Sequence, residues 1–155
     1  EGESREADQA QDVIIAVGID MVEIARVERL LASKGEHALR KLFTDAEREY
    51  ATSRPRPAIH LAARVAAKEA AYKALRGTHA ARAIGWRELE VTLAEDGSPS
   101  LLLHGGAARR AIELGVTRIH LSLTHTAGSA AAIAVLEGPG RPPDAENFTA
   151  SGAPK

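Results

Sequence analysis

The longest helical pattern in the chain is residues 58–76, AIHLAARVAAKEAAYKALR, and this stretch decides the fold. Large apolar residues recur along it at the three- and four-residue spacing that puts them on one face of a helix. They are Leu61, Val65, Tyr72 and Leu75. Alanines fill most of the other positions, and Gly77 ends the pattern. The spacing therefore predicts one long helix that packs against the rest of the core.

Three polar side chains of this helix could contact a ligand. Glu69 and Lys73 lie about a quarter to a third of a turn from the large apolar face, beside Ala62 and Ala66. Small neighbours predict room for a ligand, although an exposed pair four residues apart is the simpler interpretation. Lys68 falls on the large apolar face, where it either contacts a phosphate or extends its charged head into water.

Short apolar or alternating runs on both sides of the helix predict five strands. They are residues 13–19, 89–93, 100–104, 118–124 and 129–136. Turn residues at 95–99 predict a hairpin between the second and third strands, and the last two strands should form another.

Four further helical segments are expected between these strands. They are residues 23–34 ended by Gly35, one or two turns at 36–43, 44–50 opened by the capping-box pair Thr44 and Glu47, and 107–114 ended by Gly115. Because strands and helices are mixed without regular alternation, the predicted fold class is α+β.

Composition narrows the class of protein. The chain has 155 residues, 45% of them hydrophobic, which suits one soluble domain. A net charge of −1 argues against broad binding to nucleic acid or membrane through bulk charge. The chain has no cysteine, which excludes disulfides and thiolate sites and fits a cytoplasmic location. We expect a disordered arm at 1–12, one folded domain at 13–137 and a flexible tail at 138–155.

Several polar or aromatic residues stand where a site could form. Asp20 ends an apolar strand, so together with Glu69 it could bind a hard cation such as Mg²⁺; a simple turn residue is the alternative. His125 follows the strand at 118–124, and His120 lies on the outward face of that strand; for both, a surface or hydrogen-bonded structural position is the simpler interpretation. Trp86 is interpreted as a core or cap residue. Gly105 and Gly106 predict a turn, or less simply an anion site.

Five blocks of the sequence resemble the holo-acyl-carrier-protein synthase family of phosphopantetheinyl transferases. They are VGIDMVEIARVERL (17–30), LFTDAERE (42–49), LAARVAAKEAAYKAL (61–75), WRELEVTLAEDGSPSLLL (86–103) and IHLSLTHTAGSAAAIAVLE (119–137). The blocks occur in the family's order and cover nearly all of residues 15–137. Departures are local, such as Ala63 and Val65 around Arg64 where the family usually has Gly-Arg-Phe, and Ser98 where it often has lysine.

The resemblance implies a small α+β homotrimer, with an antiparallel sheet packed on a long helix and active sites shared between subunits. It implies that Asp20 and Glu69 hold Mg²⁺. It implies that Lys73 contacts the diphosphate and is a candidate proton donor to the leaving group. Arg64 and His125 match residues of the coenzyme A site.

The implied reaction moves 4′-phosphopantetheine from the cosubstrate coenzyme A to a serine of an apo acyl carrier protein, giving holo carrier protein and 3′,5′-ADP. Mg²⁺ and Lys73 would neutralise charge on the leaving group. The base is either Glu69 or a metal-activated water. The carrier belongs either to fatty-acid synthesis or to a polyketide pathway. The alternatives are another Mg²⁺-dependent transferase acting on a nucleotide diphosphate and a non-catalytic carrier-binding module.

A basic helix face predicts where the carrier docks. Arg26, Arg29 and Leu30 lie on neighbouring rows of the helix at 23–34, directly after Asp20. Carriers of this class are typically acidic around the acceptor serine, so a basic patch with an apolar anchor is complementary. The alternative is that Arg29 pairs with nearby glutamates and Leu30 belongs to the core.

Overall fold

The computed structural model describes residues 12–76 and 80–139, and it confirms the α+β class. The elements in chain order are β1 (Val13–Glu23), α1 (Ile24–Leu42), α2 (Asp45–Thr52), α3 (Pro57–Leu75), the 3-10 helices η1 (Ala80–Ala83) and η2 (Trp86–Glu88), β2 (Leu89–Leu93), β3 (Pro99–Leu103), α4 (Gly105–Glu113), β4 (Arg118–His125) and β5 (Ser129–Gly138). The arm and tail expected at the two ends lie outside the described residues, except for Asp12, Gly138 and Pro139.

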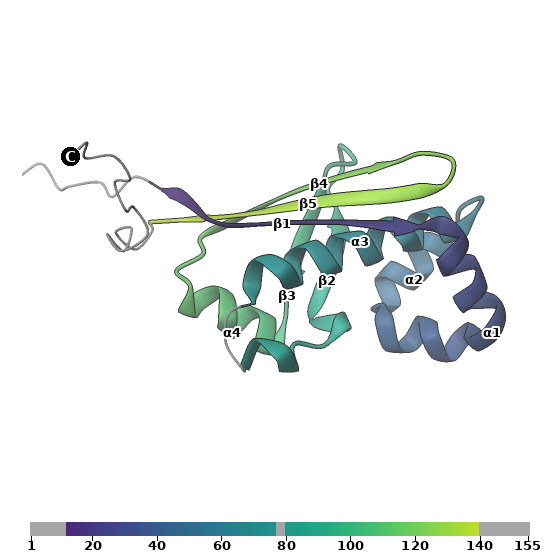
Figure 1. Ribbon diagram of the computed structural model, residues 1–155, viewed down its shortest axis with the longest axis horizontal. Helices are drawn as coiled ribbons and strands as arrows, with labels where there is room; N and C mark the ends of the chain where they lie inside the picture. The colour runs from purple at the N-terminus through teal and green to yellow at the C-terminus, as the bar shows by residue number, and fades with distance from the viewer. Residues whose placement is uncertain (1–11, 77–79, 140–155) are drawn as a thin grey trace, which may run out of the picture.

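The strands form two antiparallel sheets. Both predicted hairpins are present, β2 with β3 and β4 with β5. The larger sheet has the order β1-β5-β4, so β5 lies in its centre and β1 and β4 are its edges. Helix α3 runs beneath this sheet along the direction of its strands (Figure 1). The antiparallel sheet packed on a long helix is therefore confirmed.

The alanine-rich side of α3 is the side that packs against the sheet. Ala62, Ala66 and Ala70 are fully buried there. At Gly18 of β1 the approach is so close that an added Cβ would lie 1.8 Å from the carbonyl oxygen of Ala70. The prediction that these small residues leave room for a ligand is therefore wrong, because the strands fill that space.

Strand β1 continues past the expected end at Asp20 as far as Glu23, because β5 provides a partner along this whole stretch. Its side chains alternate between two environments. Gly18 faces α3, and Asp20 lies two residues further along on the same side. The apolar side chains on either side of these two residues point away from α3. Their exposed fractions are 52% for Val17, 65% for Ile19 and 71% for Met21.

The remaining helices follow the predicted signals with small shifts. Helix α1 spans both segments that were expected at 23–34 and 36–43, and Gly35 forms a kink between them with a φ of 45°. Helix α2 opens with the predicted capping box, in which Thr44 and Glu47 each bond to the other's backbone N–H. None of the helices in the described part of the chain combines the length and hydropathy needed to cross a lipid bilayer.

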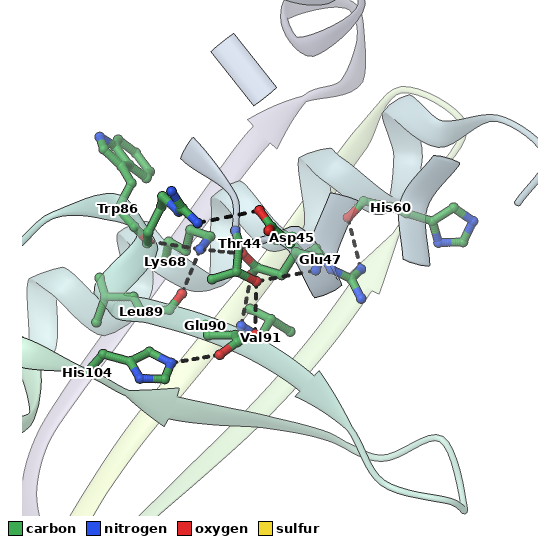
Figure 2. A network of polar contacts seen from close by, with 12 residues as sticks. Thr44, Asp45, Glu47, His60, Lys68, Trp86, Leu89, Glu90, Val91 and His104 are labelled. Atoms are coloured by element: carbon green, nitrogen blue, oxygen red, sulfur yellow. Dashed lines mark hydrogen bonds and ion pairs between the residues drawn. The ribbon is translucent and has the colours of Figure 1, made fainter. Parts of the chain in front are cut away.

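A buried ion pair joins α2, α3 and the start of β2 on the side of α3 away from the large sheet (Figure 2). Lys68 Nζ donates to Glu47 Oε2 at 2.8 Å, to the carbonyl of Trp86 at 2.9 Å and to that of Leu89 at 2.8 Å. Glu47 Oε1 accepts the backbone N–H of Val91 at 2.8 Å. All three ammonium donors are thus used inside the protein, so Lys68 neither contacts a phosphate nor extends into water as the sequence had suggested.

Candidate active site

Asp20 and Lys73 form an ion pair between β1 and α3. Lys73 Nζ donates to Asp20 Oδ1 at 2.7 Å and to the carbonyl of Ile19 at 2.9 Å. The Asp20 side chain is 19% exposed and the Lys73 side chain 38%, so both remain accessible. Lys73 therefore pairs across to the strand rather than with Glu69 within its own helix, which was the simpler expectation.

Glu69 lies one helical turn before Lys73 and borders a cavity of about 220 Å³. The cavity is lined by Lys68, Glu69, Tyr72, Arg82, Ile84, Trp86 and Leu89. Residues four apart on a helix lie on the same side, so Glu69 lies on the side of α3 that carries Lys73, the partner of Asp20. We call Asp20, Glu69 and Lys73 the carboxylate cluster.

The carboxylate cluster fits a magnesium ion that is shared with a substrate. In residues 12–76 and 80–139, no three His, Asp or Glu side chains gather as a complete protein metal site. Mg²⁺ in transferases is commonly held by one or two carboxylates, with substrate phosphates and waters as its other ligands. Asp20 already bonds one cation, the Lys73 ammonium, and Glu69 is a second carboxylate residue one helical turn from that lysine.

Arg64 is buried near the start of α3. Its guanidinium stacks 4.2 Å above the ring of Tyr50, and its Nη1 donates to the carbonyl of His60 at 3.2 Å. The Arg64 Nε has no hydrogen-bond partner among the described residues. Arg54 stacks on the same Tyr50 ring, also at 4.2 Å. Positive charge is therefore concentrated here around one aromatic ring.

His125 lies at the exposed end of β4 and belongs to the same neighbourhood. The pKa of His60 is lowered first by burial and then by the charges of Arg64, Arg54 and His125. We call these four residues the arginine–histidine cluster. The sequence analysis named Arg64 and His125 but not Arg54 and His60; the four-residue spacing of His60 and Arg64 on one helix was the available signal for His60.

The two clusters are separate within one chain. Asp20 is on edge strand β1 and His125 is on the opposite edge strand β4, with β5 between them. Along α3, Arg64 and Lys73 are nine residues apart, about 13 Å at the usual helical rise. A single chain therefore brings Asp20, Glu69 and Lys73 together but does not bring His125 to them.

The predicted docking residues line one groove. Arg26, Arg29 and Leu30 border a hollow of about 340 Å³ between α1 and α3. Its other lining residues are Val22, Val27, Ser33, Leu42, Val65 and Trp86. Both arginines are exposed, and neither makes an ion pair with another described residue, so the alternative pairing of Arg29 with a glutamate is not formed. Leu30 is only half-buried.

Three other sequence interpretations are resolved by the geometry. Gly105 and Gly106 form the start of α4, where the Glu88 carboxylate accepts the N–H of Gly106 at 3.2 Å and occupies the place of an anion. His120 lies on the surface, 2.5 Å from Glu137. Trp86 is neither core nor cap, because its half-buried side chain lines both hollows described above.

Comparison with known proteins decides the family. The family model described as the 4′-phosphopantetheinyl transferase superfamily matches residues 16–135. The chain belongs to this superfamily. Among superfamily members it is similar to a holo-[acyl-carrier-protein] synthase of Anaeromyxobacter sp. (strain K), with 46% identity over 131 residues that cover 83% of this chain and 99% of the relative.

Solved structures of superfamily members have the same fold. The chain is similar to a holo-(acyl-carrier-protein) synthase of Bacillus anthracis in complex with CoA (3′,5′-ADP), with a TM-score of 0.65, 30% identity and coverage of 81% of this chain and 97% of that one. It is also similar to the acyl carrier protein synthase of Mycobacterium tuberculosis, with a TM-score of 0.60, 37% identity and coverage of 82% and 100%.

Proposed function

We propose that this phosphopantetheinyl transferase moves 4′-phosphopantetheine from coenzyme A to a serine hydroxyl of an apo acyl carrier protein. The products are holo carrier protein and 3′,5′-ADP. The observation that carries the proposal is the accessible Asp20–Lys73 pair, one helical turn from Glu69 and its cavity, in a chain that is 46% identical to a holo-[acyl-carrier-protein] synthase. The bound ligand in the Bacillus anthracis relative supports coenzyme A as the cosubstrate.

The carboxylate cluster suits the displacement at phosphorus. The serine oxygen forms a bond to the phosphorus that carries pantetheine, and the bond from that phosphorus to the bridging oxygen of 3′,5′-ADP breaks. The serine proton passes to Glu69 or to a water molecule. Asp20 and Ile19 use two of the three Lys73 donors, and no other residue in 12–76 or 80–139 bonds the third, which can stabilise or protonate the leaving oxygen.

Mg²⁺ would be held by carboxylates of this site. Asp20 and Glu69 would hold the ion, and when bound it supplies further neutralisation of the charge that develops on the leaving group. Arg64 and His125 would belong to the coenzyme side, where Arg64 and Arg54 offer positive charge to phosphate groups.

The test of the function is the intact mass of apo carrier proteins after incubation with coenzyme A and Mg²⁺. We expect a gain of one phosphopantetheine that requires both coenzyme A and the divalent metal. Carriers from fatty-acid synthesis and from polyketide pathways should be assayed side by side, which assigns the pathway. If no carrier gains mass while a known transferase modifies the same samples, the proposed function is wrong.

The groove of Arg26, Arg29 and Leu30 is the proposed docking surface for the carrier. Two exposed arginines around an apolar floor complement an acidic protein surface that presents an apolar side chain. The double variant Arg26→Glu, Arg29→Glu should raise the KM for the carrier steeply, more so at low salt, and leave the KM for coenzyme A nearly unchanged. An unchanged carrier KM at low salt would place docking elsewhere.

We propose a homotrimer with shared active sites. The outward face of β1 exposes Val17, Ile19 and Met21, which are large apolar side chains in a row, and a second copy of the chain would cover them. Pairing one subunit's carboxylate cluster with a neighbour's His125 would also complete a site that one chain leaves divided. The lack of cysteine and the use of coenzyme A favour the cytoplasm as the working compartment.

A further inference from the structure

The single tryptophan of the chain stands at the boundary between the two hollows of the proposed site. Trp86 lines the cavity that contains Glu69, and it lines the groove that contains Arg26, Arg29 and Leu30. Within residues 12–76 and 80–139 it is the only residue that lines both. Whatever occupies each hollow therefore comes within reach of the same indole.

The backbone of Trp86 is held from inside the protein. Its carbonyl accepts a hydrogen bond of 2.9 Å from Lys68 Nζ, and Lys68 is itself fully buried against Glu47. Figure 2 shows the indole extending away from this network. The side chain is only half-buried, although its attachment point is fixed by one of the most enclosed groups in the chain.

The chemistry of an indole suits both neighbours. It offers a broad apolar face and one N–H donor, with few rotatable bonds to immobilise. The pantetheine arm of coenzyme A is a flexible chain of apolar segments and amides, and the acceptor serine of a carrier lies on a surface segment that must approach from the docking groove. Holding two reactants in alignment is a large part of the rate gain when they come from separate molecules.

We propose that Trp86 positions the two substrates against each other, contacting the pantetheine arm on the cavity side and the carrier segment around the acceptor serine on the groove side. This inference rests on the proposed function. It assigns Trp86 a role in binding and alignment, and the displacement at phosphorus remains with the carboxylate cluster.

The emission of Trp86 tests the proposal directly, because no other tryptophan contributes. The wild-type protein is titrated in Mg²⁺ with coenzyme A, and separately with an apo carrier that lacks tryptophan. Each titration should change the emission intensity or wavelength. The control ligand is 3′,5′-ADP, which has the nucleotide but no pantetheine arm, and it should leave the emission nearly unchanged.

Variants separate alignment from a merely structural role. Trp86→Ala should raise the KM for both substrates and lower kcat/KM at least tenfold, whereas Trp86→Phe, which keeps an aromatic ring, should recover most of the activity. The matched control is Ile112→Ala, which removes an exposed apolar side chain on α4 outside both hollows and should change neither constant.

The outcomes distinguish the two levels of the proposal. If calorimetry detects no binding of coenzyme A and no carrier gains mass, the proposed function fails. If both substrates bind and react while the emission responds to only one of them or to neither, the role of Trp86 is overturned and the function stands. Should Trp86→Ala fail to fold, the wild-type titrations still decide.

Discussion

Two lysines of α3, five positions apart, have opposite surroundings. Lys68 is fully buried, and its three donors are bound by Glu47 and two backbone carbonyls. Burial lowers the pKa of Lys68, and the Glu47 carboxylate opposes that shift. Lys73 is partly exposed, and its ammonium bonds one carboxylate and one carbonyl. Only Lys73 therefore has a donor available for a substrate.

Loss of the Lys73 ammonium should impair catalysis much more than stability. Lys73→Ala, Asp20→Ala and Glu69→Ala should each lower kcat by orders of magnitude, because charge on the leaving group is then poorly neutralised. The partly exposed pair contributes only about 1 kcal/mol to folding, so the urea midpoint should change little. Mass-based initial rates and denaturation curves provide both readouts. Near-wild-type kcat in any of the three would remove that residue from the site.

Loss of the Lys68 ammonium should instead reduce the stability of the folded protein. In Lys68→Met the Glu47 carboxylate stays buried without its cation, which costs roughly 3–5 kcal/mol of unfolding free energy. Denaturation of this variant beside Lys73→Met, in the same helix, gives the comparison. Adding Glu47→Leu to Lys68→Met should recover part of the loss, because no unpaired charge then remains. Equal stability of the two single variants would contradict the assignment.

The sequence pointed to Asp20, Glu69 and Lys73 as candidate site residues, but not to the burial of Lys68. Asp20, Glu69 and Lys73 interrupt otherwise apolar elements, and a family pattern assigns them roles. The acceptor Glu47 lies 21 residues before Lys68, and the other two acceptors are backbone carbonyls. The positions of those carbonyls depend on how η2 and β2 fold over α3, which a helical spacing alone does not contain.

At the scale of elements, β1 and α3 touch through the backbone. A methyl group at Gly18 would collide with the Ala70 carbonyl, so Gly18→Ala must push the strand away from the helix. We expect a loss of about 3 kcal/mol or more of unfolding free energy. Gly128→Ala is the matched control, because nothing lies within 4 Å of the position that its Cβ would take. Equal melting temperatures for the two variants would show that the contact is not tight.

The start of α3 should make stability depend on pH. Burial and neighbouring cations lower the pKa of His60 in the folded state, so the unfolded chain binds the proton more readily. The unfolding free energy should therefore fall as the pH drops below about 6.5, the ordinary pKa of histidine. The fall should end once the pH is below the pKa that His60 has in the folded protein. His60→Gln should flatten this part of the profile in urea titrations from pH 7 to 5. An unchanged slope would mean that His60 does not contribute.

The sequence predicted elements better than their contacts. Capping pairs, glycines and apolar periodicity located each α-helix and strand to within a few residues, because these signals are local, but the 3-10 helices η1 and η2 were not predicted. The end of β1 was misplaced because a charged residue usually closes an apolar run, whereas here β5 continues to pair beyond Asp20. The alanine face of α3 was misread because small residues admit either a ligand or a strand, and only the tertiary fold distinguishes them.

At the scale of the whole molecule, one chain leaves its two clusters apart, and this separation predicts complementation. Mixtures of Glu69→Ala and His125→Ala subunits, unfolded and refolded together, should recover part of the activity that each variant lacks alone. Light scattering should show a trimer in each case. A fully active wild-type monomer would exclude the shared site, and two inactive variants that stay inactive when mixed would place both residues in the same subunit's site.

The alternation of side chains along β1 places two different requirements on neighbouring residues. One set must fit against α3, and the other forms the exposed apolar face. Gly18 and Asp20 lie on the side of α3, while Val17, Ile19 and Met21 point outward. A slip of one residue against β5 would exchange the two sets completely. Insertions and deletions in this strand should therefore be almost absent among functional variants. The kind of substitution that is tolerated should instead alternate along the strand. Positions that face α3 should be limited in side-chain size, and positions that point outward should be limited in polarity.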